Sequence, residues 1–140
     1  MMVSVHAAVG AALGGLLQRP GQSFAAGVAS HLLCDLFPHR DFDIKIEAPL
    51  AAAMFTYLGL RYGINSPQVW GAAGAVSPDA ENALKVLGVI REDQMMFPTH
   101  NRTASWFVGH GEPVESPLPQ VALALICLLL ADREKDGANP

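Results

Sequence analysis

The sequence predicts a single all-helical domain, a compact bundle of about five to seven helices. Hydrophobic residues make up 51% of the 140 residues and charged residues only 16%, a balance that favours a packed core over disorder. Ala and Leu exceed the Val, Ile, Thr and Tyr that strands favour. No segment alternates between apolar and polar residues with a period of two, so we expect no sheet.

Glycines and prolines divide the chain into helical segments. We predict one domain over residues 1–131, followed by a charged, flexible tail over 132–140. Gly10 and Gly14 lie one turn apart on an apolar helix, a spacing that lets a neighbouring helix approach closely. Three Ser-Pro pairs are typical of helix starts, because serine caps a helix whose first residue is proline. The expected helices cover about 3–18, 22–37, 48–61, 67–73, 78–88, 101–109 and 117–132.

The charge of the chain limits its partners. The formal net charge is -4, and Lys and Arg form no cluster, so we expect no nucleic-acid partner. A small phosphorylated substrate fits better, and Arg102 could hold its phosphate. The apolar runs at 48–60 and 118–131 are shorter than the roughly 18–20 residues of a membrane span. Association with a membrane surface stays open as an alternative.

The two cysteines point to a reducing compartment. Cys34 and Cys127 each lie in an apolar helical context, which predicts buried thiols without a disulfide and suits the cytoplasm. A thiol nucleophile needs a base beside it. Cys34 projects to a different helix face from His31, so we do not expect it to act as one.

The strongest local signal is the pair His31 and Asp35. Their i, i+4 spacing puts both side chains on one helix face, near enough to share an ion. Imidazole and carboxylate together suit zinc, iron, nickel or manganese. Apolar neighbours make an ionised Asp35 costly unless it is paired or coordinated. The alternative is a buried His–Asp hydrogen bond that joins helices. His39, with Arg40 and Asp41 directly after it, completes the densest cluster of ligand-type residues.

Four other residues are weaker candidates. His6 lies on an otherwise apolar helix. There it is either a metal ligand or a core histidine whose hydrogen bonds are satisfied. Asp79 begins a helix, and capping alone would explain an acid there. His100 lies in a polar stretch next to Arg102. His110 lies between two glycines, and we expect it to be exposed and inert.

Together these segments resemble a known family pattern. The segment Ser30-His31-Leu32-Leu33-Cys34-Asp35-Leu36-Phe37-Pro38-His39-Arg40-Asp41, with the later Gly74-Ala75-Val76-Ser77-Pro78-Asp79 and Thr99-His100-Asn101, resembles small uncharacterised bacterial proteins with an SHxxxDxxPHxD segment. Those proteins are similar to membrane-bound metal-dependent hydrolase-like proteins and, more distantly, to the all-helical zinc-dependent phospholipase C and P1 nuclease fold.

The resemblance implies a set of metal ligands, and zinc as the first choice of ion: His6, His31, Asp35, His39, Asp79 and His100. It covers residues about 3–41 well and 71–103 loosely. Ala80-Glu81 stand where the hydrolase-like proteins commonly carry a second Asp, so the resemblance does not extend to a shared two-metal arrangement. The chain is also much shorter than a phospholipase C.

We therefore expect a metal-binding protein, with metal-dependent phosphoester hydrolysis as the reaction class. The ion would lower the pKa of its bound water and supply a hydroxide near neutral pH, and Asp79 or Glu81 could act as general base. The alternative is a non-enzymatic helical scaffold or binding protein, at a membrane surface or in a homodimer. High hydropathy, the Gly10 and Gly14 face and the apolar last helix favour that alternative.

Overall fold

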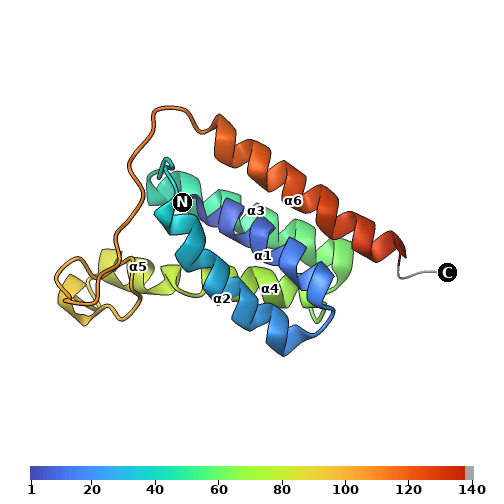
Figure 1. Cartoon of the computed structure of the whole chain (residues 1–140), viewed down its shortest axis with the longest axis horizontal. Coiled ribbons are helices and arrows are strands. Elements are labelled where there is room, and N and C mark those ends of the chain that lie inside the picture. The colour runs from blue at the N-terminus through green and yellow to red at the C-terminus, as the bar shows by residue number, and fades with distance from the viewer. Residues whose placement is uncertain (138–140) are drawn as a thin grey trace.

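The chain folds into a bundle of helices (Figure 1). The computed structural model describes residues 1–137, and the side chains of residues 1–132. Within that part there are no strands, only an isolated bridge between His39 and Pro113, so the all-helical prediction is confirmed. The elements are α1 (Val3–Leu17), α2 (Pro20–Leu36), α3 (Ile44–Tyr62), α4 (Pro67–Val76), α5 (Asp79–Val86), the 3₁₀-helix η1 (Glu92–Gln94) and α6 (Leu118–Gly137).

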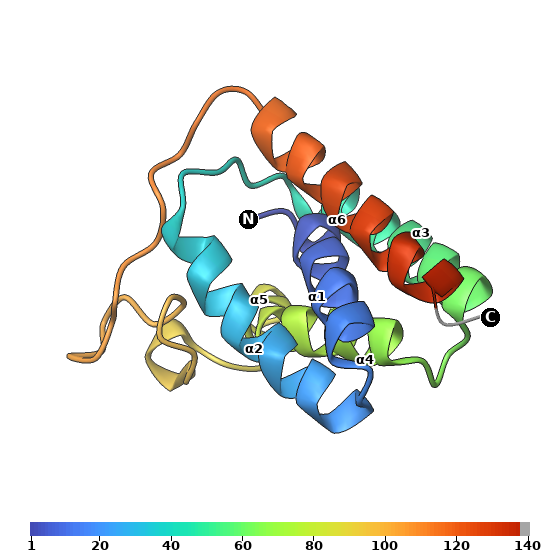
Figure 2. The same ribbon diagram turned by 45° about the vertical axis from the view of Figure 1, so that its right-hand side comes forward.

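Helix α1 lies at the centre of the bundle. It contacts α2, α3, α4 and α6, and Figure 2 shows it between α2 and α4 on one side and α3 and α6 on the other. Its Ala7 and Ala11 pack in one core cluster with Leu58 and Ala72. A second cluster joins its other face to Cys127 of α6. The central helix is therefore built from small residues that let four neighbours come close.

Glycines set the closest helix crossings. A Cβ at Gly10 would collide with the backbone of Gly71 in α4, and a Cβ at Gly71 would collide with the backbone of Gly10. A Cβ at Gly27 in α2 would collide with the Gly71 carbonyl, and one at Gly74 with the Phe24 carbonyl. These contacts bring α1 and α2 against α4 backbone to backbone, as small residues at helix interfaces allow. The close approach predicted for Gly10 and Gly14 is confirmed.

Several helix ends differ from the predicted ones. Helix α3 begins at Ile44 rather than residue 48, because the side chain of Asp43 accepts a hydrogen bond from Lys45 N (2.9 Å) and caps it. Helix α6 continues to Gly137, through most of the segment predicted as a tail. Residues 138–140 lie outside the described part.

The helix predicted at 101–109 is absent, and that prediction is wrong: the described segment contains turns only. The side chain of Asn101 accepts hydrogen bonds from the backbone N–H (3.1 Å) and hydroxyl (2.7 Å) of Thr103. Its amide group donates to the Met95 carbonyl (2.8 Å). Local bonds of this kind compete with helix formation. They hold the segment as a folded loop.

The outer face of the last helix is apolar. Four of its leucine and isoleucine side chains are more than half exposed, namely Leu118, Leu125, Ile126 and Leu129. Among the described helices, none combines the length and hydropathy that crossing a membrane requires.

The glycine crossings give a first prediction. Gly71→Ala places a methyl group against the Gly10 backbone, so we expect it to lower the free energy of unfolding by about 3 kcal/mol or more. Urea unfolding followed by circular dichroism measures the change. The matched control is Gly59→Ala in α3, where the new Cβ meets only Ile64 Cγ2 at 3.6 Å. That variant should keep or gain stability, by up to about 1 kcal/mol. Equal stability of the two variants would contradict the crossing.

Candidate metal centre

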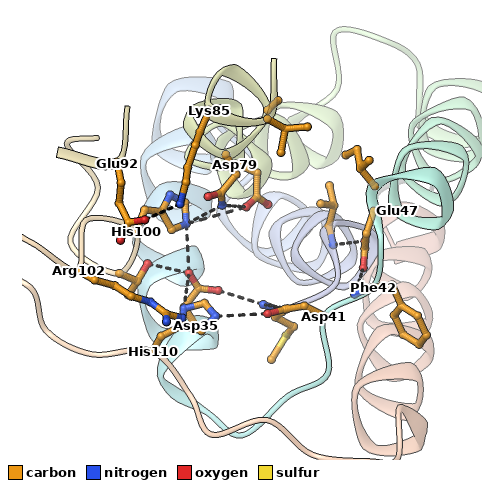
Figure 3. A pocket seen from close by; sticks show the side chains of 17 residues that line it. Asp35, Asp41, Phe42, Glu47, Asp79, Lys85, Glu92, His100, Arg102 and His110 are labelled. Carbon is orange, nitrogen blue, oxygen red and sulfur yellow. Dashed lines mark hydrogen bonds and ion pairs between the residues drawn. The ribbon is translucent and has the colours of Figure 1, made fainter. Parts of the chain in front are cut away.

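All five histidines of the chain gather around the carboxylate of Asp35. Asp35 lies in the last turn of α2 and is 1% exposed. The histidines come from α1, from α2, from the loop after α2 and from the long connection to α6: His6, His31, His39, His100 and His110. Figure 3 shows Asp35 between His100 and His110, with Asp41 and Asp79 facing the same space.

The glycine crossings place the first of these side chains. His6 precedes Gly10 by one turn of α1, and His31 follows Gly27 by one turn of α2. The two imidazole rings consequently stack, with centroids 3.9 Å apart and planes 15° from parallel. In α4, Ala75 follows Gly71 by one turn, and the Ala75 carbonyl accepts a hydrogen bond from His31 Nδ1 (2.6 Å).

His31 has a defined tautomer. A carbonyl oxygen can only accept, so the bond to Ala75 puts the proton of a neutral His31 on Nδ1. The lone pair on its Nε2 then points at three other groups. These are Asp35 Oδ2 at 3.2 Å, His100 Nε2 at 3.2 Å and Asp79 Oδ1 at 3.9 Å. We call His31, Asp35 and His100 the inner group, with Asp79 beside it.

His100 is brought in by a loop rather than by a helix. Its backbone N–H bonds to the Phe97 carbonyl (3.0 Å). Both oxygens of Glu81 hold this loop, accepting from the N–H groups of Met96 and Phe97 at 3.0 Å each. The neighbouring Thr99 donates its hydroxyl to Asp35 Oδ2 (2.7 Å). His100 Nε2 thereby lies 3.5 Å from the same carboxylate oxygen.

A second set of side chains lies on the other side of Asp35. His39 Nε2 is 3.0 Å from His110 Nε2 and 3.2 Å from Asp41 Oδ1. His110 Nδ1 is 3.9 Å from Asp35 Oδ2. We call His39, His110 and Asp41 the outer group. The prediction that His110 is exposed is wrong, because its side chain is only 21% exposed.

The protonation of the cluster follows from burial and charge. Burial would raise the pKa of Asp35, but hydrogen bonds from His100, His31 and His6 outweigh it and hold the pKa far below its ordinary range. Burial likewise opposes the shift at Asp41, where His110 and His39 lower the pKa of the carboxyl. Both groups are therefore carboxylates at neutral pH, even though Asp35 is buried.

The imidazoles of α1 and α2 shift in opposite directions. Burial lowers the pKa of His6 to about 4, against the opposing hydrogen bond to Asp35. Burial also acts to lower the pKa of His31, but its bond to Asp35 and the negative charges of Asp79 and Asp35 raise it overall. His6 is thus neutral, and it bonds through Nε2 to Asp35 Oδ1 (3.1 Å).

Several buried polar atoms in the cluster have no hydrogen-bond partner: His6 Nδ1, Asp79 Oδ2, His100 Nδ1 and His110 Nδ1. Native proteins leave few such groups, and each one calls for an explanation. A cavity of about 530 Å³ adjoins the cluster, and Asp35, Asp79, His100 and His110 all line it. Lys85 and Arg102 lie on its wall (Figure 3).

The structure brings together all six residues that the sequence suggested as metal ligands. They form, with His110, three overlapping groups whose donor atoms lie within 4.8 Å of one another: His6, His31 and Asp79; His31, Asp35 and His100; and Asp35, His39 and His110. These buried His and Asp groups could hold a metal ion. The free thiol of Cys34 takes no part, and burial raises its pKa to about 11.

Sequence reasoning missed His110 and the bond from Thr99. The glycines on each side of His110 suggested a plain loop, but they are what lets the chain turn this residue inward. Gly109 has φ +108°, and a Cβ at Gly111 would collide with the Phe37 carbonyl. A histidine between two glycines was the only signal available.

Comparisons of the chain with protein-family models, with curated proteins and with solved structures find no match. The site is therefore interpreted from its own geometry.

The depressed pKa of His6 predicts a pH dependence. Its pKa falls from 6.5 to about 4 on folding, so between these values the unfolded chain binds more protons. The His6 contribution to stability is then present above pH 6.5 and is lost as the pH falls to about 4. In chelator-treated protein we expect this loss to reach up to about 3 kcal/mol.

Urea unfolding between pH 4 and pH 7 measures this loss of stability, and the His6→Gln variant is the comparison. His31 acts in the opposite sense because its pKa is raised, so the difference between the two proteins reports on His6. The variant should show a flatter loss of stability toward low pH. Identical pH profiles would contradict the assignment of a buried neutral imidazole.

Proposed function

We propose that the chain binds a divalent transition-metal ion, zinc first, at the inner group, and that it is a metal-dependent hydrolase acting on a phosphoester. One observation carries the metal site: the spacing of three donor atoms. His31 Nε2, Asp35 Oδ2 and His100 Nε2 lie 3.2, 3.2 and 3.5 Å apart. Tetrahedral zinc with bonds of about 2.0–2.1 Å separates its ligands by roughly 3.3–3.4 Å.

Without a metal ion, this arrangement requires particular protonation states of the inner histidines. Neutral His31 has its proton on Nδ1, so its Nε2 lone pair faces the lone pairs of Asp35 across 3.2 Å. One proton from His100 could lie between the two imidazoles, but it leaves the carboxylate contact repulsive. The other solution is a doubly protonated His31, the form that its raised pKa favours and that donates to Asp35. It places a buried cation against neutral His6, at a cost in desolvation energy. A metal ion would take up the facing lone pairs of His31 Nε2, Asp35 Oδ2 and His100 Nε2 together.

The surrounding bonds match the usual support of a metal site. Ligating histidines typically donate their other N–H to a carbonyl or carboxylate, which fixes the tautomer and the ring orientation. His31 does this with Ala75. The donor set is imidazole nitrogen and carboxylate oxygen without thiolate, which suits zinc and also manganese, iron or nickel.

The proposed chemistry is hydrolysis. A bound ion would supply Lewis acidity and lower the pKa of a water molecule toward neutrality. Asp79 lines the cavity and has one buried oxygen without a hydrogen-bond partner. Asn82 orients its other oxygen from 3.3 Å. We therefore assign Asp79 the role of general base, and Glu81, whose two oxygens already bond the Met96 and Phe97 N–H groups, the role of positioning the His100 loop.

The cavity offers two cations to an anionic substrate, within a lining that also holds the carboxylates of Asp35, Asp41, Glu47, Asp79 and Glu92. Arg102 and Lys85 line it, and guanidinium and ammonium groups bind phosphate oxygens. Lys85 also pairs with Glu92 (2.6 Å), which keeps its ammonium group near the rim. The resemblance of the segment around His31 to metal-dependent hydrolase-like proteins points to the same reaction class.

The alternative proposal is a non-enzymatic scaffold that uses the exposed apolar face of α6 at a membrane surface or in a homodimer. In that case the histidines only join helices, and no ion is bound. Metal content separates the two proposals directly.

Protein purified without an affinity tag should contain metal by mass spectrometry, and chelation should remove it. His100→Gln should weaken zinc binding about 100-fold or more, while the exposed-surface control Asp93→Asn should leave it unchanged. Wild-type protein that neither contains nor takes up a transition metal would sink the proposal.

Activity is measured on aryl phosphate mono- and diesters with the zinc-loaded protein. Asp79→Asn should retain zinc but lower kcat by about 10²–10⁴-fold, the usual contribution of a general base. Zinc binding without turnover in wild type would confine the function to metal binding.

A further inference from the structure

The outer group has a built framework of its own. Residues 109–114 form a strap that crosses the C-terminal end of α2. Its backbone bonds once to the last turn of α2, Gly111 N to Asp35 O (2.6 Å), and twice to the loop that follows, His39 N to Glu112 O (3.3 Å) and Val114 N to His39 O (3.1 Å). The strap is thus held by its main chain, and the His110 side chain is not needed to anchor it.

The two outer histidines face each other with nitrogen lone pairs that hydrogen bonds do not fully use. His39 Nδ1 donates to the Phe37 carbonyl (2.7 Å), so the lone pair of a neutral His39 is on Nε2. That nitrogen lies 3.0 Å from His110 Nε2 and 3.2 Å from Asp41 Oδ1. If His110 supplies the one proton between the rings, the lone pair of a neutral His39 still faces Asp41 Oδ1, an oxygen that the N-terminal ammonium of Met1 also contacts at 3.0 Å.

The same proton leaves His110 unsatisfied elsewhere. Its buried Nδ1 has no hydrogen-bond partner and faces Asp35 Oδ2 at 3.9 Å. The donor atoms repeat the pattern of the inner group: a histidine fixed by a backbone carbonyl, a second histidine about 3 Å away and a carboxylate oxygen beside them. His39 is 2% exposed and His110 21%, so two of the three donors are buried or half-buried histidines, and this is not a surface cluster of acids.

We propose that His39, His110 and Asp41 hold a second divalent metal ion, with Asp35 shared between the inner and outer positions. Asp35 belongs to a group of potential ligands with His31 and His100 and to another with His39 and His110. Its Oδ2 faces His31 and His100 on one side and His110 on the other. This inference deepens the proposed function and rests on it. In phosphatases and nucleases, pairs of metal ions stabilise both the attacking and the leaving oxygens of a phosphoester, so a second ion supports the proposed substrate class.

The cavity places the outer group within reach of that substrate. Asp35, Asp41 and His110 line the same cavity as His100 and Arg102. A phosphoester bound there contacts both positions and the guanidinium group together. Asp41 is 60% exposed, so the outer position opens toward the cavity while His39 closes it behind.

Counting ions tests the inference. Chelator-treated wild type, His110→Ala and the strap control Glu112→Ala are each loaded with zinc and weighed by native mass spectrometry. We expect two ions in wild type, one in His110→Ala and two in Glu112→Ala. If His110→Ala loses its helical circular dichroism, Asp41→Asn replaces it, with the same expectation of one ion.

The number of ions bound distinguishes failure of the second site from failure of the inner site. One ion in both wild type and His110→Ala overturns the second site and leaves the inner site standing. No ion in wild type overturns both. Two ions in wild type and two in folded His110→Ala overturn the assignment to His39, His110 and Asp41. Loss of both ions from folded His110→Ala overturns the idea of two separable positions.

Discussion

The contact of α1 and α2 with α4, backbone against backbone, is the constraint on which the site depends. Gly10, Gly27 and Gly71 leave no space for a Cβ at the crossing. One helical turn away, on the same end of the bundle, lie His6, His31 and the carbonyl of Ala75. A larger residue at a crossing would push the helices apart and separate the stacked rings from the carbonyl that orients them. The small residues of the central helix therefore belong to the site as much as its ligands do.

The second constraint is charge. A buried carboxylate is costly, and Asp35 meets that cost with contacts from His6, His31, His100 and the Thr99 hydroxyl. The N-terminal ammonium of Met1 adds a contact with Asp35 Oδ1 at 3.3 Å. His31 and His39, which carbonyls fix, turn the Nε2 lone pair of the neutral ring toward the carboxylates. A metal cation between these nitrogen and carboxylate oxygen atoms would bind their lone pairs and make the contacts stabilising.

Local patterns foretold part of this from the sequence. The spacing of His31 and Asp35 on one helix face, the serine cap at Ser66 and the glycines of α1 all act within a few residues. The position of His110 depends instead on the strap, which backbone hydrogen bonds hold to residues some seventy positions earlier, such as the bond from Gly111 N to Asp35 O. Nothing near it in the sequence marks that path. Likewise the side-chain bonds of Asn101 override the apparent helix at 101–109.

Anomalous X-ray diffraction at the zinc absorption edge, from crystals of zinc-loaded untagged protein, locates the ion itself. Metal binding by the inner group predicts an anomalous peak bounded by His31 Nε2, Asp35 Oδ2 and His100 Nε2, with bonds of about 2.0–2.2 Å. The contrary result is a zinc-loaded crystal without a peak among these three atoms, which would show that the histidines serve only to join helices.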